Sequence, residues 1–263
     1  MEQFRQQPED ADQKVNHPES RPLSYRMTAY AVVVLSAVLG QVSLLSLGLF
    51  LYHGAFHLIP LNLNEAGIFT VNFGLCLAFF LQHSFMVRKG FRQWLGQYIR
   101  QEFHPALYSI ASGIALLAIV ILWQKSSIIA ASPQGWLYWA LRGGYFFSIA
   151  GFVWGNVALG SFDSFGLNSI LNHVKGISPP PRTFVVRGPY RWVRHPLYFF
   201  SLLMIWSCPF LTLDKLVFNV LFTVWTLIGM NLEERDLVAH FGRDYHEYQK
   251  KVPILIPTRI PQG

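Results

Sequence analysis

The first of two polar segments that could do chemistry runs from Arg187 to Tyr198. It contains three arginines, a histidine and two prolines, directly before and within the start of an apolar run. Pro196 suits the first turn of a helix, where its missing N–H does no harm. Arg194 and His195 are therefore expected at the positive end of that helix, where backbone donors and a guanidinium can hold an anion such as a carboxylate. A charged anchor at the membrane surface explains the same composition equally well.

The second polar segment follows an apolar run and opens with two adjacent carboxylates, Glu233 and Glu234. Negative charge is disfavoured at the C-terminal end of a helix, so both side chains need partners. A ligand amino group, ribose hydroxyls or the arginines of the first segment could serve. Apolar and aromatic residues then recur at helical spacing, namely Leu237, Phe241, Tyr245 and Tyr248. This spacing predicts an amphipathic helix on the membrane surface, bent near Gly242, that acts as a lid.

Two further ionisable residues lie beside apolar runs: His83 near the end of one, and Asp163 just after another. An ionisable side chain at membrane depth is a functional candidate by default. Structural roles are the alternative. The histidine could join Gln82 in a hydrogen bond between helices, and the aspartate could form an ion pair with Arg187 or Arg191.

The composition of this 263-residue chain is that of a membrane protein: 52% of its residues are apolar, 13% are charged and the mean hydropathy is +0.31. A soluble domain has about 25% charged residues. The net charge of +7 comes from bases between apolar runs rather than from a basic stripe, which argues against a nucleic-acid partner. Cys76 and Cys208 lie within apolar runs, so neither a disulfide framework nor a metal site is expected.

Six apolar runs predict an all-α, polytopic membrane protein in contact with lipid, with a cytosolic C-terminal helical segment. Four runs have the length of full spans, and two shorter runs separated by Asp214-Lys215 predict a helical hairpin whose first arm is kinked at Pro209. The runs are Met27–Tyr52, Ala66–Val87, Pro105–Trp123, Trp136–Leu159, Pro196–Leu213 and Leu216–Asn231.

The distribution of basic residues predicts the orientation of these helices, because cytoplasmic loops carry an excess of Lys and Arg. With the N-terminus inside, 18 of the 21 bases face the cytosol, and the outer side receives Lys125, Arg142 and Lys215. Both termini and both polar segments are then cytosolic. A bacterial inner membrane is the expected location.

The C-terminal part of the sequence resembles a known superfamily, the integral-membrane methyltransferases. That group includes isoprenylcysteine carboxyl methyltransferases and phospholipid N-methyltransferases. The resemblance rests on four motifs: Arg194-His195-Pro196-x-Tyr198, Glu233-Glu234, Gly242-x-x-Tyr245-x-x-Tyr248 and Val252-Pro253-x-x-x-Pro257. One departure is Phe200, where many members have glycine.

Other stretches are most similar to the methanethiol S-methyltransferase subgroup. They comprise Arg187-Gly188-Pro189-Tyr190-Arg191, Glu233-Glu234-Arg235-Asp236-Leu237-Val238, Gln82-His83-Ser84-Phe85-Met86 and Phe162-Asp163-x-Phe165-Gly166-Leu167. The resemblance implies methyl transfer from S-adenosylmethionine to a small thiol, which gives dimethyl sulfide from methanethiol.

The resemblance also implies which residues contact the cofactor. The basic side chains would meet its carboxylate, a glutamate would take its amino group or ribose, and the tyrosines could offer ring faces to its sulfonium or adenine. These residues are Tyr190, Arg194, His195, Tyr198, Glu233 and Glu234. His83 and Asp163 are the candidates to orient or deprotonate the thiol, because the thiolate is the reactive form.

Three other functions stay open at this point. One is a methyltransferase acting on an isoprenylcysteine or a lipid. Another is a sterol-type reductase using NADPH, because those enzymes share the Gly-x-x-Tyr and Val-Pro tail. The third is a membrane protein without catalytic activity. The expected segments are a disordered cytosolic tail at 1–26, a four-helix transmembrane part at 27–160, a cytosolic loop at 161–195 and a hairpin with the C-terminal cofactor-binding segment at 196–263.

Overall fold

The computed structural model describes residues 22–160, 163, 165–178 and 184–259. Helices dominate the described residues, which confirms the all-α prediction. The elements in chain order are α1 (Leu23–His53), α2 (Glu65–Met86), α3 (Lys89–Leu95), η2 (Gln101–Phe103), α4 (His104–Leu122), β1 (Ile129–Ala131), α5 (Gly135–Leu159), α6 (Leu167–Lys175), η3 (Gly188–Arg191), α7 (Pro196–Trp206), β2 (Leu211–Thr212), α8 (Leu213–Phe241) and α9 (Arg243–Lys251).

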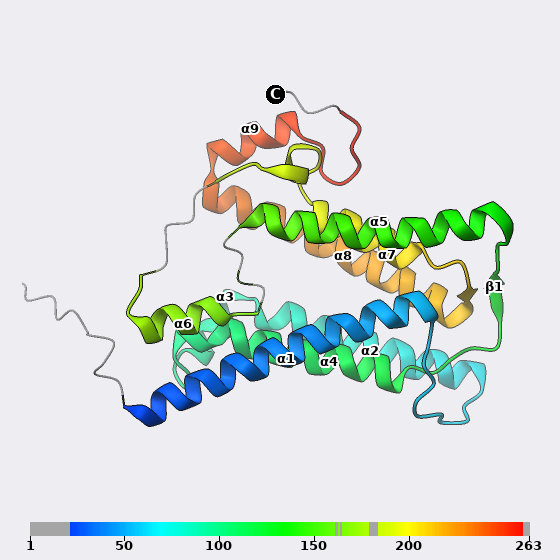
Figure 1. Ribbon diagram of the computed structural model, residues 1–263, viewed down its shortest axis with the longest axis horizontal. Helices are drawn as coiled ribbons and strands as arrows, with labels where there is room; N and C mark the ends of the chain where they lie inside the picture. The colour runs from blue at the N-terminus through cyan, green and yellow to red at the C-terminus, as the bar shows by residue number, and fades with distance from the viewer. Residues whose placement is uncertain (1–21, 161–162, 164, 179–183, 260–263) are drawn as a thin grey trace, which may run out of the picture.

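The long helices lie along the long axis of the molecule, as Figure 1 shows. Helix α1 packs against α4, α4 packs against α2, α5 packs against α7, and α2 contacts α8. The start of α1 and helices α3, α6 and α9 lie towards one end, and β1 lies at the opposite end (Figure 1). This arrangement brings the two polar segments of the sequence to the same end of the molecule.

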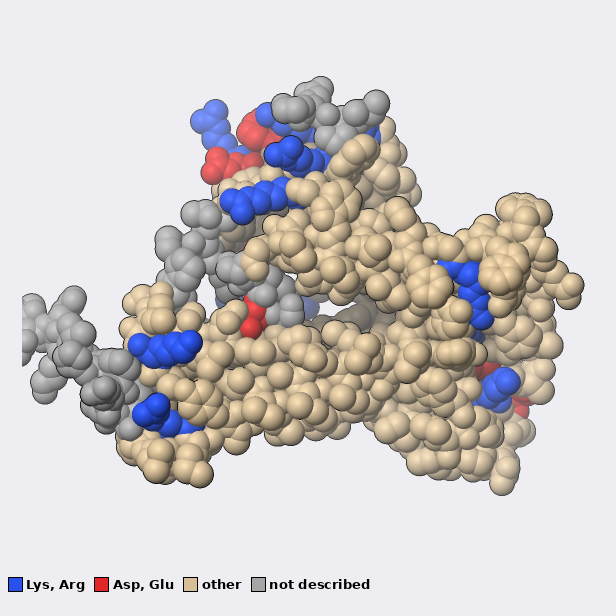
Figure 2. Space-filling model, in the orientation of Figure 1, with Lys and Arg blue, Asp and Glu red and all other residues tan. Residues whose placement is uncertain are grey.

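The protein is an integral membrane protein. Within the described residues, four helices are long and apolar enough to cross a bilayer: Leu23–His53, Glu65–Met86, Gln101–Leu122 and Leu213–Phe241. Helix α5, the predicted fourth span, is not among these four, although its 25 residues give it a length of roughly 37 Å against a hydrocarbon thickness of about 30 Å. Helix α8, predicted as a shorter hairpin arm, is one of them. In Figure 2 the Lys and Arg side chains gather towards the two ends, with a broad band of uncharged residues between them.

The predicted hairpin is confirmed in outline, but its arms differ from the prediction. Helix α7 ends at Trp206, so Pro209 lies beyond the helix instead of kinking it. A proline disfavours helical backbone in the residue before it, which explains the early end. Helix α8 runs without a break to Phe241, well past the predicted end at Asn231.

Two more features of the chain bear on the predictions. The predicted bend near Gly242 is present: this residue has a φ of +55° and separates α8 from α9. The sequence analysis missed a short antiparallel pairing of β1 with β2. Of the predicted N-terminal tail, residues 1–21 lie outside the described residues, and α1 already begins at Leu23.

The main core is aromatic and lies among α1, α2, α4, α7 and α8, with Tyr145 from α5 at its edge. Phe50, Trp123 and Phe218 are almost fully buried there, and their rings meet edge to face. A second, smaller core joins α6 to α1 and α4 through Ala29 and Ile170. These cores fix the helices whose ends carry the candidate site.

Candidate functional site

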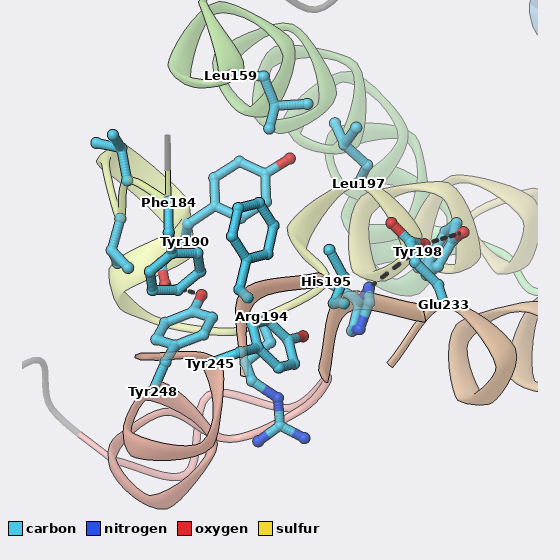
Figure 3. Close-up of a pocket in the computed structure, with 14 residues that line it drawn as sticks. Leu159, Phe184, Tyr190, Arg194, His195, Leu197, Tyr198, Glu233, Tyr245 and Tyr248 are labelled. Carbon is cyan, nitrogen blue, oxygen red and sulfur yellow. Dashed lines mark hydrogen bonds and ion pairs between the residues drawn. The ribbon is translucent and has the colours of Figure 1, made fainter. Parts of the chain in front are cut away.

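A cavity of about 360 Å³ is lined by the segment 184–186, by η3, by the starts of α7 and α9, and by the C-terminal parts of α5 and α8. Its volume is in the range of roughly 300–1,000 Å³ of small-molecule sites. Figure 3 shows rings on one side of this cavity and a carboxylate on another. The lining residues are Leu159, Phe184, Val185, Val186, Tyr190, Arg194, His195, Leu197, Tyr198, Glu233, Leu237, Phe241, Tyr245 and Tyr248.

The first polar segment is held in place by the C-terminal tail. The backbone N–H of Arg194 donates to the carbonyl of Pro253 at 2.9 Å, and the N–H of His195 donates to the carbonyl of Ile254 at 3.1 Å. Pro196 occupies the first turn of α7, as the sequence predicts. Two motifs more than 50 residues apart in the sequence therefore form one wall.

The Arg194 guanidinium is almost fully engaged by the protein itself. Its Nε and Nη2 donate to the two carboxylate oxygens of Glu234 at 3.0 and 2.9 Å, and its Nη1 donates to the carbonyls of Gln249 and Val252 at 3.1 and 2.8 Å. A guanidinium has five N–H donors, so the protein itself engages four of them. The sequence analysis left open that arginines of the first segment are the partners of the carboxylates. The Arg194–Glu234 pair is a contact of this kind.

The two adjacent glutamates occupy different positions. Glu234 is absent from the cavity wall and accepts further bonds from the Tyr245 hydroxyl at 2.6 Å and the Gln249 amide at 2.7 Å. Glu233 lines the cavity and accepts a 2.6 Å bond from Tyr198. His195 lies between them, with Nε2 at 2.7 Å from Glu234 Oε1 and Nδ1 at 3.9 Å from Glu233 Oε2.

Six aromatic rings surround the cavity: Phe184, Tyr190, Tyr198, Phe241, Tyr245 and Tyr248. Phe184 meets three of them edge to face or at a tilt, and the Tyr198 ring stacks on His195 with centroids 5.3 Å apart. Burial raises the pKa of Tyr190, Tyr245 and Tyr248 above the ordinary tyrosine value. These rings are therefore neutral at physiological pH and offer faces that attract a cation.

Similarity to known proteins identifies the family of this chain. The family described as phospholipid methyltransferase matches residues 144–244. Methanethiol S-methyltransferase of Pseudomonas deceptionensis is 33% identical over 195 residues, which are 70% of this chain and 71% of that protein. The enzyme of the same name from Crocosphaera subtropica is 33% identical over 193 residues, 71% of this chain and 74% of that protein.

The chain belongs to the methanethiol S-methyltransferase family. Methanethiol S-methyltransferase 2 of Bradyrhizobium diazoefficiens agrees, with 31% identity over 198 residues, 75% of this chain and 76% of that protein. No solved structure matches the chain significantly. The predicted family and the predicted enzyme class, a methyltransferase, are confirmed. The matched phospholipid methyltransferase region includes most of the cavity wall, from Leu159 to Phe241.

His83 of this methyltransferase lies in a small polar cluster between α2 and α4. The Tyr108 hydroxyl is 2.5 Å from its Nε2 and 3.1 Å from its Nδ1, and the Ser112 hydroxyl is 3.2 Å from Nδ1. The rings of Phe79 and Trp225 lie within 5.2 and 5.1 Å of the imidazole centroid. The Gln82 amide donates to the same Ser112 hydroxyl. The structural alternative for His83, a hydrogen bond with Gln82, is therefore present only through Ser112.

Asp163 precedes α6. Its two carboxylate oxygens accept bonds from the backbone N–H groups of Leu167 and Ser169 at 2.8 and 3.0 Å. Such bonds satisfy free donors in the first turn of a helix. These hydrogen bonds give Asp163 a structural role that does not require it to take part in the reaction. Its catalytic assignment stays a prediction.

The sequence analysis did not single out Tyr108 or Ser112, although both lie on one face of α4 opposite His83. Their spacing of four residues on a predicted helix was the available signal. The expectation that no metal is bound stays untested, and the described residues contain no group of three or more His, Cys, Asp or Glu able to hold a metal ion.

Proposed function

We propose that this protein transfers a methyl group from S-adenosylmethionine to methanethiol and so produces dimethyl sulfide. The observation that carries the proposal is the aromatic cavity with one carboxylate, Glu233, in its wall. Aromatic faces bind cations, and a carboxylate binds an ammonium group. When bound, S-adenosylmethionine supplies a methyl group on a positively charged sulfur, next to an ammonium group. The cavity therefore suits both of its cationic groups.

Five of the six predicted cofactor residues receive a specific part in this proposal. Glu233 pairs with the amino group or the ribose, and Tyr190 and Tyr198 present ring faces. Arg194 offers its remaining N–H to the cofactor carboxylate. Glu234 acts indirectly, because it positions the Arg194 guanidinium and the His195 imidazole and does not itself line the cavity.

The thiol needs proximity to the methyl group, a dry site and a route for its proton. We assign the role of proton acceptor to His83, because it is a histidine enclosed by rings and hydrogen-bonded to a hydroxyl. A neutral imidazole has one nitrogen lone pair that can accept a proton. The proton would leave the thiol as sulfur attacks the methyl carbon.

The excess of basic residues at the cavity end supports a cytosolic site in a bacterial inner membrane, with both termini inside. Soluble S-adenosylmethionine would then enter from the cytosol. Cysteine-scanning accessibility in sealed cells tests this orientation, since position 247 on α9 should react only with a membrane-permeant reagent.

The decisive experiment offers the purified protein methyl-labelled S-adenosylmethionine together with methanethiol, an isoprenylcysteine analogue or phosphatidylethanolamine. Labelled dimethyl sulfide in the headspace supports the proposal, and label on the prenyl or lipid acceptor contradicts it. A parallel calorimetric titration with NADPH tests the reductase alternative. Glu233→Gln is the matched variant, and it should weaken the binding of S-adenosylmethionine while the fold is retained.

A further inference from the structure

We propose that Leu197 limits the size of the methyl acceptor and so restricts the reaction to thiols with a short alkyl group. This inference rests on the proposed thiol methylation and extends it by naming a residue that determines specificity. Leu197 lies in the first turn of α7 and lines the cavity. Leu159, at the end of α5, lines the same cavity, and Figure 3 shows both leucines on the side away from Arg194.

The Leu197 side chain packs against a buried glycine of the neighbouring helix. A Cβ atom at Gly155 of α5 would lie 2.7 Å from Leu197 Cδ2 and 3.5 Å from its Cγ. The optimal separation of two carbon atoms is about 3.5–4.0 Å, so only glycine leaves room for the leucine in this position. This part of the cavity wall therefore depends on a leucine that fills the space beside a glycine.

The same arrangement continues along the contact between α5 and α7. The Phe200 ring occupies the space of the absent side chain at Gly151. Phe200 is only 6% exposed, and its ring meets Phe147 edge to face. Further along, the Ser207 hydroxyl lies 3.0 Å from the position of a Cβ atom at Gly144. Side chains of α7 thus fill this contact from the cavity to the far end of the helix, where a prenyl or acyl chain would have to pass to reach the lipid on this side.

The position of Leu197 relative to Glu233 puts it beside the reacting atoms. In S-adenosylmethionine a short methylene chain joins the sulfonium to the carbon that carries the amino group, and the ribosyl group is attached directly to the sulfonium. Whichever of these groups Glu233 binds, the reacting methyl group lies only a few bonds away. Glu233 accepts a hydrogen bond from Tyr198, the residue after Leu197, and all three side chains line one cavity. The thiol therefore meets the methyl group next to Leu197.

The hydrocarbon wall at this point suits the alkyl group of the thiol. Leu159 and Leu197 contribute only apolar side-chain atoms, and contact with apolar atoms favours an alkyl group. A methyl group needs little space there. A longer chain meets Leu197, which cannot move back because α5 lies directly behind it at Gly155. The expected substrates are therefore short alkanethiols.

The test measures kcat/KM for alkanethiols from methanethiol to butanethiol, with the purified full-length protein and saturating S-adenosylmethionine. In wild type, kcat/KM should fall as the chain grows. Leu197→Ala enlarges the site and should raise the ratio of kcat/KM for butanethiol to that for methanethiol by about 10-fold or more, since one methylene in an apolar pocket changes kcat/KM about 10–200-fold. Leu202→Ala, the same substitution on α7 outside the cavity wall, is the matched control and should keep the wild-type ratio.

Gly155→Ala tests the same contact from the other side. Its new Cβ displaces Leu197 Cδ2, the end of a flexible side chain, so the leucine moves towards the open space of the cavity. The helix should be retained, because alanine is a better helix former than glycine. Gly155→Ala should therefore lower kcat/KM more for butanethiol than for methanethiol. The double variant of both substitutions should return towards the wild-type ratio, because the alanine at position 155 fills part of the space that the leucine leaves.

A ratio between two acceptors is insensitive to other effects of these variants. Changes in cofactor affinity or in the folded fraction are common to both reactions and cancel. Two results overturn the inference: a wild-type ratio in Leu197→Ala, and a ratio in the double variant as high as in Leu197→Ala alone. If Leu197→Ala does not fold, a wild-type ratio in Gly155→Ala contradicts the inference. Failure of the proposed function has a different signature: the wild-type protein binds S-adenosylmethionine but methylates no thiol of the series, and the inference falls with it.

Discussion

Arg194 and Glu234 form a two-point ion pair, with Nε at 3.0 Å from Oε1 and Nη2 at 2.9 Å from Oε2. Their side chains are only 11% and 10% exposed, so the pair is shielded from water. The pair joins the segment before α7 to the far part of α8, and Tyr245 and Gln249 add α9 to the same carboxylate. This network holds the wall of the cavity in place, and Glu234 itself does not line the cavity.

Glu234→Gln should therefore destabilise the protein. Removing one partner of a buried ion pair costs about 3–5 kcal/mol because the other charge stays buried and unpaired. A lower thermal unfolding midpoint in detergent, measured without any cofactor, is the expected result. Glu233→Gln should keep the wild-type midpoint, since the Glu233 side chain is 46% exposed and its hydrogen-bond partner among the described residues is Tyr198.

The pair of variants also separates two explanations of lost cofactor binding. If Glu233→Gln loses affinity for S-adenosylmethionine at an unchanged midpoint, the carboxylate binds the ligand directly. A Glu234→Gln protein with wild-type stability and no affinity would reverse the roles that we assign to the two neighbours.

A second prediction concerns the recognition of the sulfonium by Tyr190. A cation over an aromatic face gains about 0.5–2 kcal/mol, so Tyr190→Leu should weaken S-adenosylmethionine about 2- to 30-fold. The demethylated product has a neutral sulfur and should lose little affinity. Calorimetry with both ligands measures the difference, and Tyr190→Phe, which keeps the ring, is the control. Equal losses for both ligands would show that Tyr190 packs against another part of the cofactor.

The sequence predicted this end of the molecule well where the signal was local. Hydropathy located the long spans, and Gly242 marked the break between α8 and α9 because its backbone adopts a positive φ. The motif spacing placed His195, Tyr198 and Glu233 together, since charge complementarity needs partners near the same membrane face. All three line the cavity.

Contacts between distant segments could not be predicted in the same way. The two glutamates have the same neighbours in sequence, and only the orientation of α8 decides that Glu234 faces Arg194 while Glu233 faces the cavity. The sequence did not mark Tyr108 as a candidate functional residue, because a tyrosine in an apolar run is equally explained by a position at the membrane interface. Likewise, the β1–β2 pairing depends on three-dimensional proximity of loops that carry no strand pattern.

A third prediction follows from the raised pKa of the cavity tyrosines. Burial raises the pKa of Tyr245, and its bond to the carboxylate of Glu234 adds to the effect. The stabilisation is complete below the unfolded tyrosine value of about 10. It is lost as pH rises above that value, because the unfolded chain gives up the proton first. Unfolding midpoints above about pH 10 should fall less steeply in Tyr245→Phe than in wild type, and identical slopes would contradict this.

A fourth prediction separates stability from activity at the opposite end of the molecule. Asp214 is buried and accepts bonds from the Trp123 indole N–H at 2.8 Å and the Ser126 backbone N–H at 3.0 Å. Asp214→Leu leaves both donors unpaired, at a cost of about 1–3 kcal/mol each. The unfolding midpoint should drop and kcat for the folded fraction should stay constant. A specific loss of kcat would show that the hydrogen bonds of Asp214 are coupled to the cavity.

The fifth prediction distinguishes the two residues proposed from sequence for the thiol. His83→Gln should lower kcat with a pH-dependent recovery, whereas Asp163→Ala should act on α6, because both aspartate oxygens accept backbone N–H groups there. Losing a helix cap costs about 0.5–2 kcal/mol, so Asp163→Ala should unfold at lower temperature. Asp163→Ser restores a capping oxygen without a carboxylate. Recovered stability together with wild-type kcat in Asp163→Ser would assign Asp163 to the helix, whereas recovered stability with a kcat that stays low and rises with pH would place its carboxylate in the reaction.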